Sequence, residues 1–221
     1  DPYMRMRMVD AKSYAAPQPL DQTMIGGTVG EVIESRHPKF KAGDKVVDMF
    51  GWSEIGVSDG TLLKKVPDGP VPLSAYLGAV GMPGMTAWYG LTQIMQPQQG
   101  QTVTVSAASG AVGGAVGQLA KARGCRVVGI AGGPDKCAYV KGELGFDECI
   151  DYKACPDLKS LLTALKAACP QGIDAHFENV GGQILDAVML RSNAFARIAI
   201  CGMIAGYNGN PLPMANPSLI L

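Results

Sequence analysis

The chain has 221 residues, of which 47% are hydrophobic and 17% are charged, and its formal net charge is zero. This balance is typical of a soluble globular protein with one or two domains, and without a basic block it argues against a nucleic-acid partner. The uncharged stretch 69–120 is interrupted by prolines and glutamines, so it holds no run of about 20 apolar residues and we expect no membrane span.

Six cysteines are present without the spacing of a disulfide framework, and no signal peptide opens the chain. We therefore predict free thiols and a cytoplasmic location.

The first part of the chain has the pattern of short strands joined by turns. Strands are predicted at 26–35, 45–50 and 61–66, with turn signals at Gly43-Asp44 and Asp59-Gly60. This pattern predicts part of a small β-barrel, and we assign residues 1–79 to it.

A helix predicted at 83–96, with proline in its first turn, leads into a second domain at residues 80–221. There strands and helices alternate, which predicts an α/β fold with a doubly wound parallel sheet of the Rossmann type. The predicted strands are 102–107, 126–131, 148–151, 173–180 and 197–201, and the helices are 112–122, 134 to near 145, 157 onward and 183–190. The chain starts without methionine, and the sheet is one unit short of six strands. We therefore expect the chain to be truncated at both ends.

The junction between the first of these strands and its helix contains a glycine-rich turn, 108–113. Such a turn directs backbone N–H groups and a helix N-terminus at one point, which is where a pyrophosphate binds. Gly110 would let the backbone approach the phosphates, and Gly113 would let the helix pack closely on the strand. The fingerprint G-x-G-x-x-G has Ala108 in place of its first glycine, but the strand before it and the helix after it favour a dinucleotide site.

The end of the second strand indicates which dinucleotide binds. An NAD enzyme places a carboxylate there for the ribose 2′-hydroxyl, but this chain has Ala131-Gly132-Gly133 followed by Lys136. Asp135 falls in the first turn of the next helix, where an acid is favourable in any case. We predict NADP(H), with Lys136 on the 2′-phosphate; the alternative is that Lys136 is an exposed helix lysine.

The sequence predicts no metal site. A catalytic zinc needs about three Cys, His or carboxylate ligands, and structural zinc sites show paired cysteines. The chain has no C-x-x-C and only two histidines, His37 in a polar turn and His176 inside a strand.

Several segments together resemble the zinc-independent medium-chain dehydrogenase/reductases, in the branch of prostaglandin reductases, plant alkenal double-bond reductases and bacterial curcumin reductases. The segments are DPYMRMRM, GGTVGEVIES, MPGMTAWYGL, AASGAVGGAVGQLAK, VVGIAGGPDKC, LGFDECIDYK, FENVGG and RIAICGMIAGYN. The resemblance runs almost end to end. It implies that the first domain is a fragment of a GroES-like barrel, and that the protein is a homodimer.

The same resemblance implies roles for individual residues. The pyrophosphate would contact Gly110, Ala111, Val112 and Gly113, and the 2′-phosphate would bind to Lys136 and Tyr152. Asn179 and Thr86 would contact the cofactor, with Thr86 against the nicotinamide, and the loop beside the nicotinamide would be Cys201, Gly202, Met203, Ile204, Ala205, Gly206 and Tyr207. Tyr3, Tyr14 and Tyr207 would line the substrate cleft. From the residues alone, Tyr152 could be a surface tyrosine and Asn179 a turn residue.

The reaction implied is hydride transfer from NADPH to the β-carbon of an α,β-unsaturated ketone or aldehyde. Negative charge then builds on the carbonyl oxygen, and the Tyr207 hydroxyl is our first choice of hydrogen-bond donor, with a ribose hydroxyl of the cofactor as a rival. The alternatives are an NADPH quinone reductase and a catalytically inactive NADP-binding relative.

Overall fold

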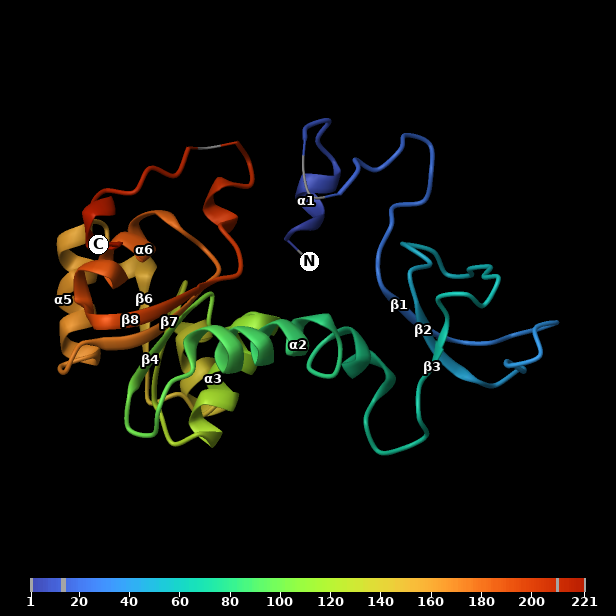
Figure 1. The fold of residues 1–221 in the computed structure, drawn as a ribbon, viewed down its shortest axis with the longest axis horizontal. Helices are drawn as coiled ribbons and strands as arrows, with labels where there is room; N and C mark the ends of the chain where they lie inside the picture. The colour runs from blue at the N-terminus through green and yellow to red at the C-terminus, as the bar shows by residue number, and fades with distance from the viewer. Residues whose placement is uncertain (1, 13–14, 210, 221) are drawn as a thin grey trace. The chain divides into compact units, whose positions relative to one another are not determined.

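The computed structural model describes residues 2–12, 15–209 and 211–220 (Figure 1). The chain divides into two compact units, Met4–Pro83 and Asp1–Tyr3 with Gly84–Leu221. The division at Pro83–Gly84 lies close to the boundary expected between residues 79 and 80, and the domain limits themselves remain a prediction.

The unit Met4–Pro83 contains a three-stranded antiparallel sheet, β1-β2-β3. Val29 pairs with Val47, and Val46 pairs with Lys65. The elements are α1 (Met4–Arg7), β1 (Thr28–Glu31), β2 (Lys45–Asp48), β3 (Lys64–Lys65) and the 3-10 helix η1 (Leu73–Leu77). Each strand is shorter than the sequence predicts. The β-strand propensity of the residues predicts the whole extended segment, whereas hydrogen bonding between the strands ends at the turns.

The second unit follows the alternation of strands and helices that the sequence predicts. After α2 (Met82–Tyr89) and the π-helix η2 (Gly90–Met95) come β4 (Thr102–Ser106), α3 (Ala111–Ala122), β5 (Arg126–Ala131), α4 (Pro134–Gly142), β6 (Glu148–Asp151), η3 (Tyr152–Ala154), α5 (Leu158–Ala168), β7 (Ile173–Glu178), α6 (Gly182–Arg191), β8 (Ser192–Ile200), η4 (Ile204–Gly206) and η5 (Pro217–Ile220). The predicted N-cap Asp157 forms a capping box with Ser160 at the start of α5. The single helix predicted at 83–96 is instead α-helical and then π-helical.

The five strands of this unit form a parallel sheet in the order β6-β5-β4-β7-β8. The chain therefore moves from β4 to one edge through β5 and β6, then crosses back and continues through β7 and β8. This order confirms the predicted doubly wound sheet, and it places the topological switch point between β4 and β7. In such sheets ligands bind outside the carboxyl ends of the strands at the switch point.

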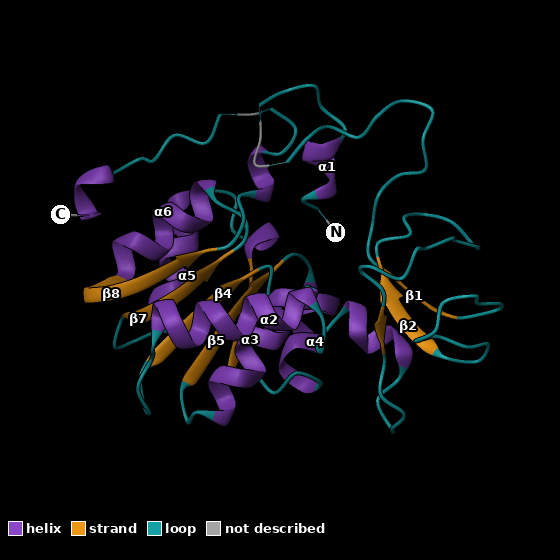
Figure 2. Ribbon diagram, turned by 45° about the vertical axis from the view of Figure 1, so that its right-hand side comes forward, coloured by secondary structure: helices purple, strands orange, loops and turns teal. Residues whose placement is uncertain are grey.

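Helices cover both faces of this sheet (Figure 2). One face packs against α2, η2, α3 and α4 through a core that includes Val103, Val105 and Phe177. The other face packs against α5 and α6 through Val128, Ile130 and their neighbours. Successive residues of a strand point to opposite faces, so Thr104 and Ser106 lie on the α5–α6 face of β4, opposite Val103 and Val105.

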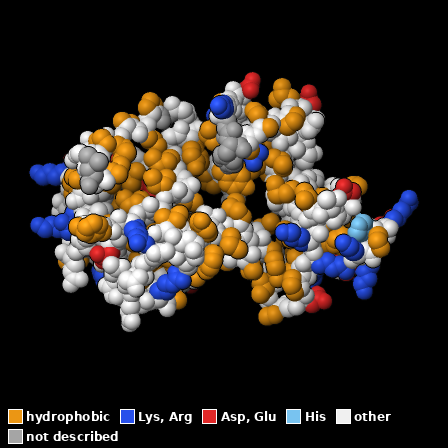
Figure 3. All heavy atoms as spheres, in the orientation of Figure 1, with side chains coloured by type: hydrophobic (Ala, Val, Ile, Leu, Met, Phe, Trp, Pro, Cys, Tyr) orange, Lys and Arg blue, Asp and Glu red, His pale blue; other side chains and the backbone are white. Residues whose placement is uncertain are grey.

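The surface shows no concentration of positive charge on the face of this unit drawn in Figure 3, where Lys and Arg side chains stand apart among apolar and uncharged surface. Across residues 2–12, 15–209 and 211–220, every helix is too short or too polar to cross a membrane.

Candidate functional site

The glycine-rich turn after β4 is tightly held. The Ala108 N–H donates to the carbonyl of Ile130 at 3.1 Å, and the Gly110 N–H donates to the carbonyl of Ala107 at 2.9 Å. A Cβ atom on Gly113 would collide with that Ala107 carbonyl, so only glycine lets α3 start this close to the strand. The first N–H groups of a helix have no acceptor within it, and the exposed Gly110 and Ala111 leave them open to an anion.

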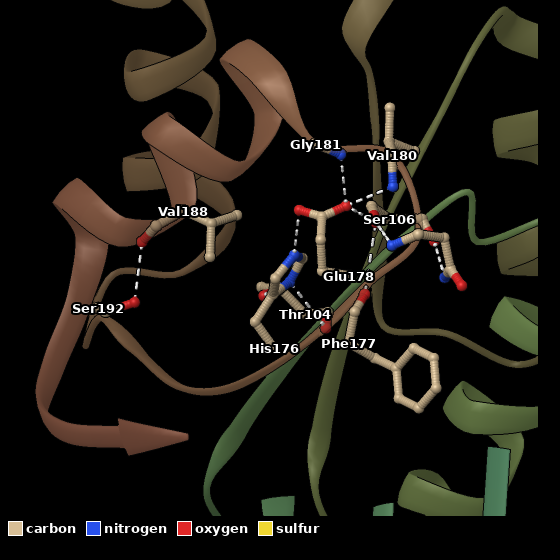
Figure 4. Close-up of polar contacts among 10 residues, drawn as sticks. Thr104, Ser106, His176, Phe177, Glu178, Val180, Gly181, Val188 and Ser192 are labelled. Atoms are coloured by element: carbon tan, nitrogen blue, oxygen red, sulfur yellow. Dashed lines mark hydrogen bonds and ion pairs between the residues drawn. The ribbon is translucent and has the colours of Figure 1, made fainter. Parts of the chain in front are cut away.

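A set of polar side chains is completely buried at the carboxyl ends of β4 and β7 (Figure 4). We call Thr104, Ser106, His176 and Glu178 the buried polar cluster. Thr104 and His176 are paired in register, and the Thr104 Oγ1 lies 2.8 Å from the His176 Nδ1. The His176 Nε2 lies 3.0 Å from a Glu178 carboxylate oxygen, and the Ser106 hydroxyl donates to the other oxygen at 2.6 Å.

Glu178 is an acid with none of its surface exposed, and it is stabilised by several donors. Besides Ser106 and His176, the backbone N–H groups of Val180 and Gly181 donate to its carboxylate. Burial by itself would raise the pKa of this carboxyl group. The hydrogen bond and charge of His176, with the hydrogen bonds of Ser106 and Val180, outweigh burial and lower the pKa of Glu178 to about 2. The carboxylate is therefore ionised at neutral pH.

The loop that follows β8 is attached to the same point of the sheet. The carbonyl of Glu178 accepts from the N–H groups of Cys201 and Gly202, at 2.9 and 3.1 Å. The carbonyl of Asn179 accepts from Ile204 at 3.1 Å. The backbone around Glu178, whose side chain lies in the buried polar cluster, thus positions the loop 201–207.

Asn179 and Tyr207 lie at this edge and are both half-buried. The Asn179 N–H donates to the Ser106 Oγ at 2.7 Å, and its side-chain amide donates to the Ser106 carbonyl at 2.8 Å. The Tyr207 hydroxyl lies over Gly202, where an added Cβ would be 3.1 Å from it and 3.8 Å from the Asn179 Cα. The end of β4, Asn179 and the Tyr207 hydroxyl are thereby brought together.

The predicted 2′-phosphate residues lie at the ends of β5 and β6, which pair through Ala131 and Asp151. We call Gly132, Gly133, Lys136 and Tyr152 the β5–β6 edge. Lys136 is exposed in the first turns of α4, and the Tyr152 ring lies over Gly132, since an added Cβ there would be 3.0 Å from the hydroxyl. A carboxylate that the sequence reasoning did not consider lies here too: Asp151 accepts from the Gly133 N–H at 2.7 Å and holds this turn.

The remaining predicted residues are less closely connected to these groups. Thr86 is half-buried on α2, and Tyr3, also half-buried, belongs to the same unit as Gly84–Leu221. Tyr14 lies outside the described residues.

Sequence reasoning missed Ser106 and Glu178 and treated His176 only as a packed residue. A signal was present: His176 and Glu178 are two residues apart in an otherwise mostly apolar strand, so they point to one face of a sheet covered on both sides. A buried charge needs a hydrogen-bonding or oppositely charged partner. A charged side chain in such a strand therefore predicts a buried polar network.

Comparisons with known proteins agree with this architecture. Residues 1–66 match the N-terminal domain of oxidoreductase, and residues 111–221 match the zinc-binding dehydrogenase family. The chain belongs to the zinc-binding dehydrogenase family. Relatives also confirm the resemblance to the curcumin, alkenal and prostaglandin reductases.

Two curated relatives and one solved structure illustrate this. The chain is 47% identical over 213 residues to an NADPH-dependent curcumin reductase of Escherichia coli K12, covering 96% of the chain and 61% of the relative. It is 49% identical over 210 residues to an NADP(+)-dependent 2-alkenal reductase of Nicotiana tabacum, covering 94% and 60%. The structure of CurA from Vibrio vulnificus in complex with NADPH superimposes with a TM-score of 0.90 at 48% identity, over 100% of this chain and 65% of that one. The chain thus spans about three fifths of the length of these curated relatives.

His176 is not available to a zinc ion. Both ring nitrogens of His176 are already engaged, by Thr104 and Glu178, inside the protein. The His37 Nδ1 accepts from the Lys39 N–H, and its ring packs on Phe40. Within the part of the chain that the structure describes, no three His, Cys, Asp or Glu side chains come together as a ligand set.

Proposed function

We propose that the chain is the greater part of an NADPH-dependent reductase that acts on the carbon-carbon double bond of α,β-unsaturated ketones or aldehydes. The observation that carries the proposal is the convergence at the switch point of the parallel sheet. The glycine-rich turn after β4, Asn179 after β7 and Tyr207 after β8 all lie at one edge, joined through Ser106 and Glu178. The curcumin and 2-alkenal reductases to which the chain is similar support the substrate class by their names.

NADP(H) fits this edge from one end to the other. The N-terminus of α3 at Gly110–Gly113 would hold the pyrophosphate, because the first N–H groups of a helix have no acceptor within it and Gly113 keeps side-chain atoms out of the turn. Lys136 and Tyr152 would take the 2′-phosphate at the β5–β6 edge, and the loop Cys201–Tyr207 would lie beside the nicotinamide. Thr86 would lie against the nicotinamide from α2.

When bound, NADPH supplies a hydride for the β-carbon of the substrate. The residues of the chain then need to stabilise the charge that develops on the substrate carbonyl oxygen. The Tyr207 hydroxyl can donate a hydrogen bond to this oxygen. Tyr3 and Tyr14 are proposed to line the substrate cleft with it, and water would protonate the α-carbon.

The test is loss of absorbance at 340 nm with full-length protein, NADPH or NADH, and a panel of enones beside a quinone. Enone-dependent oxidation of NADPH, much faster than that of NADH, is the expected result. Reduction of the quinone alone would replace this proposal with a quinone reductase. Binding of NADPH without turnover would identify an inactive relative.

Tyr207→Phe tests the role of the hydroxyl within that reaction. We expect kcat to fall about a hundredfold with little change in the Kd for NADPH, because one donor to a developing oxyanion is lost. Tyr139→Phe on α4 is the matched control and should leave kcat unchanged. An unaltered kcat in Tyr207→Phe would instead favour the ribose hydroxyl of the cofactor as the donor.

We further propose that the enzyme is cytoplasmic, homodimeric and independent of zinc. Activity should survive prolonged dialysis against a strong chelator, since both ring nitrogens of His176 and the Nδ1 of His37 already have partners. Sedimentation of the full-length protein should give twice the monomer mass.

A further inference from the structure

Two thiols outside the proposed reaction lie in contact. Cys137 is on α4 and Cys149 is on β6, and the Cys149 Sγ lies 3.2 Å from the Cys137 Sγ. A disulfide has a sulfur separation of about 2.05 Å, so the two atoms need to approach by about 1.2 Å. The two sulfur atoms are therefore already close to bonding distance.

The pair is also accessible. Cys125 and Cys169 are buried, Cys125 donating to the Gln98 carbonyl, whereas Cys137, Cys149 and Cys155 are partly exposed and Cys201 is exposed. A small oxidant can therefore reach the pair from solvent. Both elements belong to the same unit, and α4 lies against β6 in it. We propose that Cys137 and Cys149 form a modification site, a dithiol that hydrogen peroxide oxidises to an intramolecular disulfide.

The two thiols have different parts in this step. Burial and the neighbouring Cys137 raise the pKa of Cys149, which keeps its proton and is a poor first nucleophile. Cys137 therefore attacks: its thiolate forms a bond to one peroxide oxygen, the O–O bond breaks, and hydroxide leaves. The product is a sulfenic acid on Cys137.

The second step closes the bond. The Cys149 sulfur attacks the Cys137 sulfur, the S–O bond breaks, and the proton of the thiol leaves with hydroxide as water. In total two thiols lose two protons and two electrons, and one peroxide takes them up and becomes two waters. A disulfide formed this way in a reducing compartment is transient and is reversed by thiol reductants.

The two cysteines lie close in sequence to residues of the proposed cofactor site. Cys137 directly follows Lys136, and Cys149 precedes Asp151, which holds the Gly133 turn. The oxidation state of this pair therefore has to be fixed by a reductant in any measurement on the β5–β6 edge.

The experiment treats reduced, desalted full-length protein with a small excess of hydrogen peroxide and then counts thiols after denaturation. We expect the loss of two thiols, a decrease in intact mass of about 2 Da, and a disulfide-linked peptide pair containing Cys137 and Cys149, all reversed by dithiothreitol. Cys137→Ser and Cys149→Ser should each abolish the linked pair. Cys155→Ser, which removes another partly exposed thiol, should behave like the wild type.

Three results would overturn the assignment. They are a mass increase by oxygen without thiol pairing, linkage through other cysteines, or covalent dimers on non-reducing gels in place of the internal bond. Peptide mapping of the wild type decides this even if a serine variant folds poorly. The outcome does not depend on NADPH turnover, so the site and the proposed reductase activity can fail separately.

Discussion

The two ends of the proposed cofactor site are built in opposite ways. The buried polar cluster is completely enclosed, and each of its groups has a partner within the protein. The β5–β6 edge presents exposed side chains, with Lys136 and Tyr152 both open to solvent. Burial holds the Glu178 carboxylate in one position, but removing this charge from water is unfavourable. The exposed Lys136 ammonium stays hydrated and available to a ligand. Changes in the cluster should therefore affect folding, and changes at the edge should affect binding.

The largest effect is expected for Glu178→Ala. It removes the carboxylate that accepts from the buried Ser106 hydroxyl and from the backbone N–H groups of Val180 and Gly181, and that lies 3.0 Å from the buried His176 ring. The free energy of unfolding should fall by about 3–5 kcal/mol in chemical denaturation. Glu148→Ala, which removes an acid exposed on 44% of its side chain, should have a much smaller effect. Equal losses in the two variants would contradict the contrast between the regions.

Acid should act through the same group. The pKa of Glu178 is lowered from 4.5 to about 2 in the fold, so its contribution to stability is complete above pH 4.5 and disappears as the pH falls through about 2. Between pH 6 and pH 3 this corresponds to a loss of about 2 kcal/mol. Denaturation curves of the wild type should show this dependence, and those of Glu178→Gln should lack this part of it. A wild-type stability that does not change over this range would refute the assignment of a low pKa.

Lys136→Ala should affect binding but not stability. We expect the Kd for NADPH to rise about tenfold because a charge-assisted contact to a phosphate is lost, whereas the Kd for NADH should not change. Calorimetric titration in the presence of reductant measures both. Lys141→Ala on the same helix is the control, because Lys141 already pairs with Glu148 at 2.9 Å. If the Kd values for NADPH and NADH rise equally in Lys136→Ala, the lysine does not bind the 2′-phosphate.

The smallest effect is expected at the surface pair of Lys141 and Glu148. The side chains are 47% and 44% exposed, so solvent and salt screen the attraction. Lys141→Gln should shift the midpoint of thermal unfolding by no more than the error of the measurement. A clear destabilisation would show that this exposed ion pair also contributes to folding.

The sequence predicts the sheet well because the relevant signals are local. Strand 126–131 and strand 148–151 have the predicted limits, and Asp157 caps its helix as expected. These features depend on side-chain alternation and on hydrogen bonds between near neighbours. The predicted strand 26–35 was too long, because the length of a paired strand depends on a partner elsewhere in the chain.

The candidate site is less predictable for the same reason. The glycines of the turn after β4 could be recognised from their spacing. The contact between Ser106 and Glu178 could not be predicted, because it exists only when β4 and β7 are neighbours. The polarity of His176 and Glu178 within a mostly apolar strand is visible in the sequence, but their partners are not. The contact of Cys137 and Cys149 likewise requires the pairing of β5 with β6.

The separation between β4 and β7 also sets an order of events during synthesis. Ser106 and Glu178 are 72 residues apart, so the central strand emerges from the ribosome long before its acidic partner exists. At about 5–20 residues per second the delay is about 4–14 s, far longer than a helix takes to form. During this interval β4 and the turn that would cradle the phosphates have no neighbour on one side. Cofactor binding is therefore expected only after Gly181 has emerged and β7 can pair with β4.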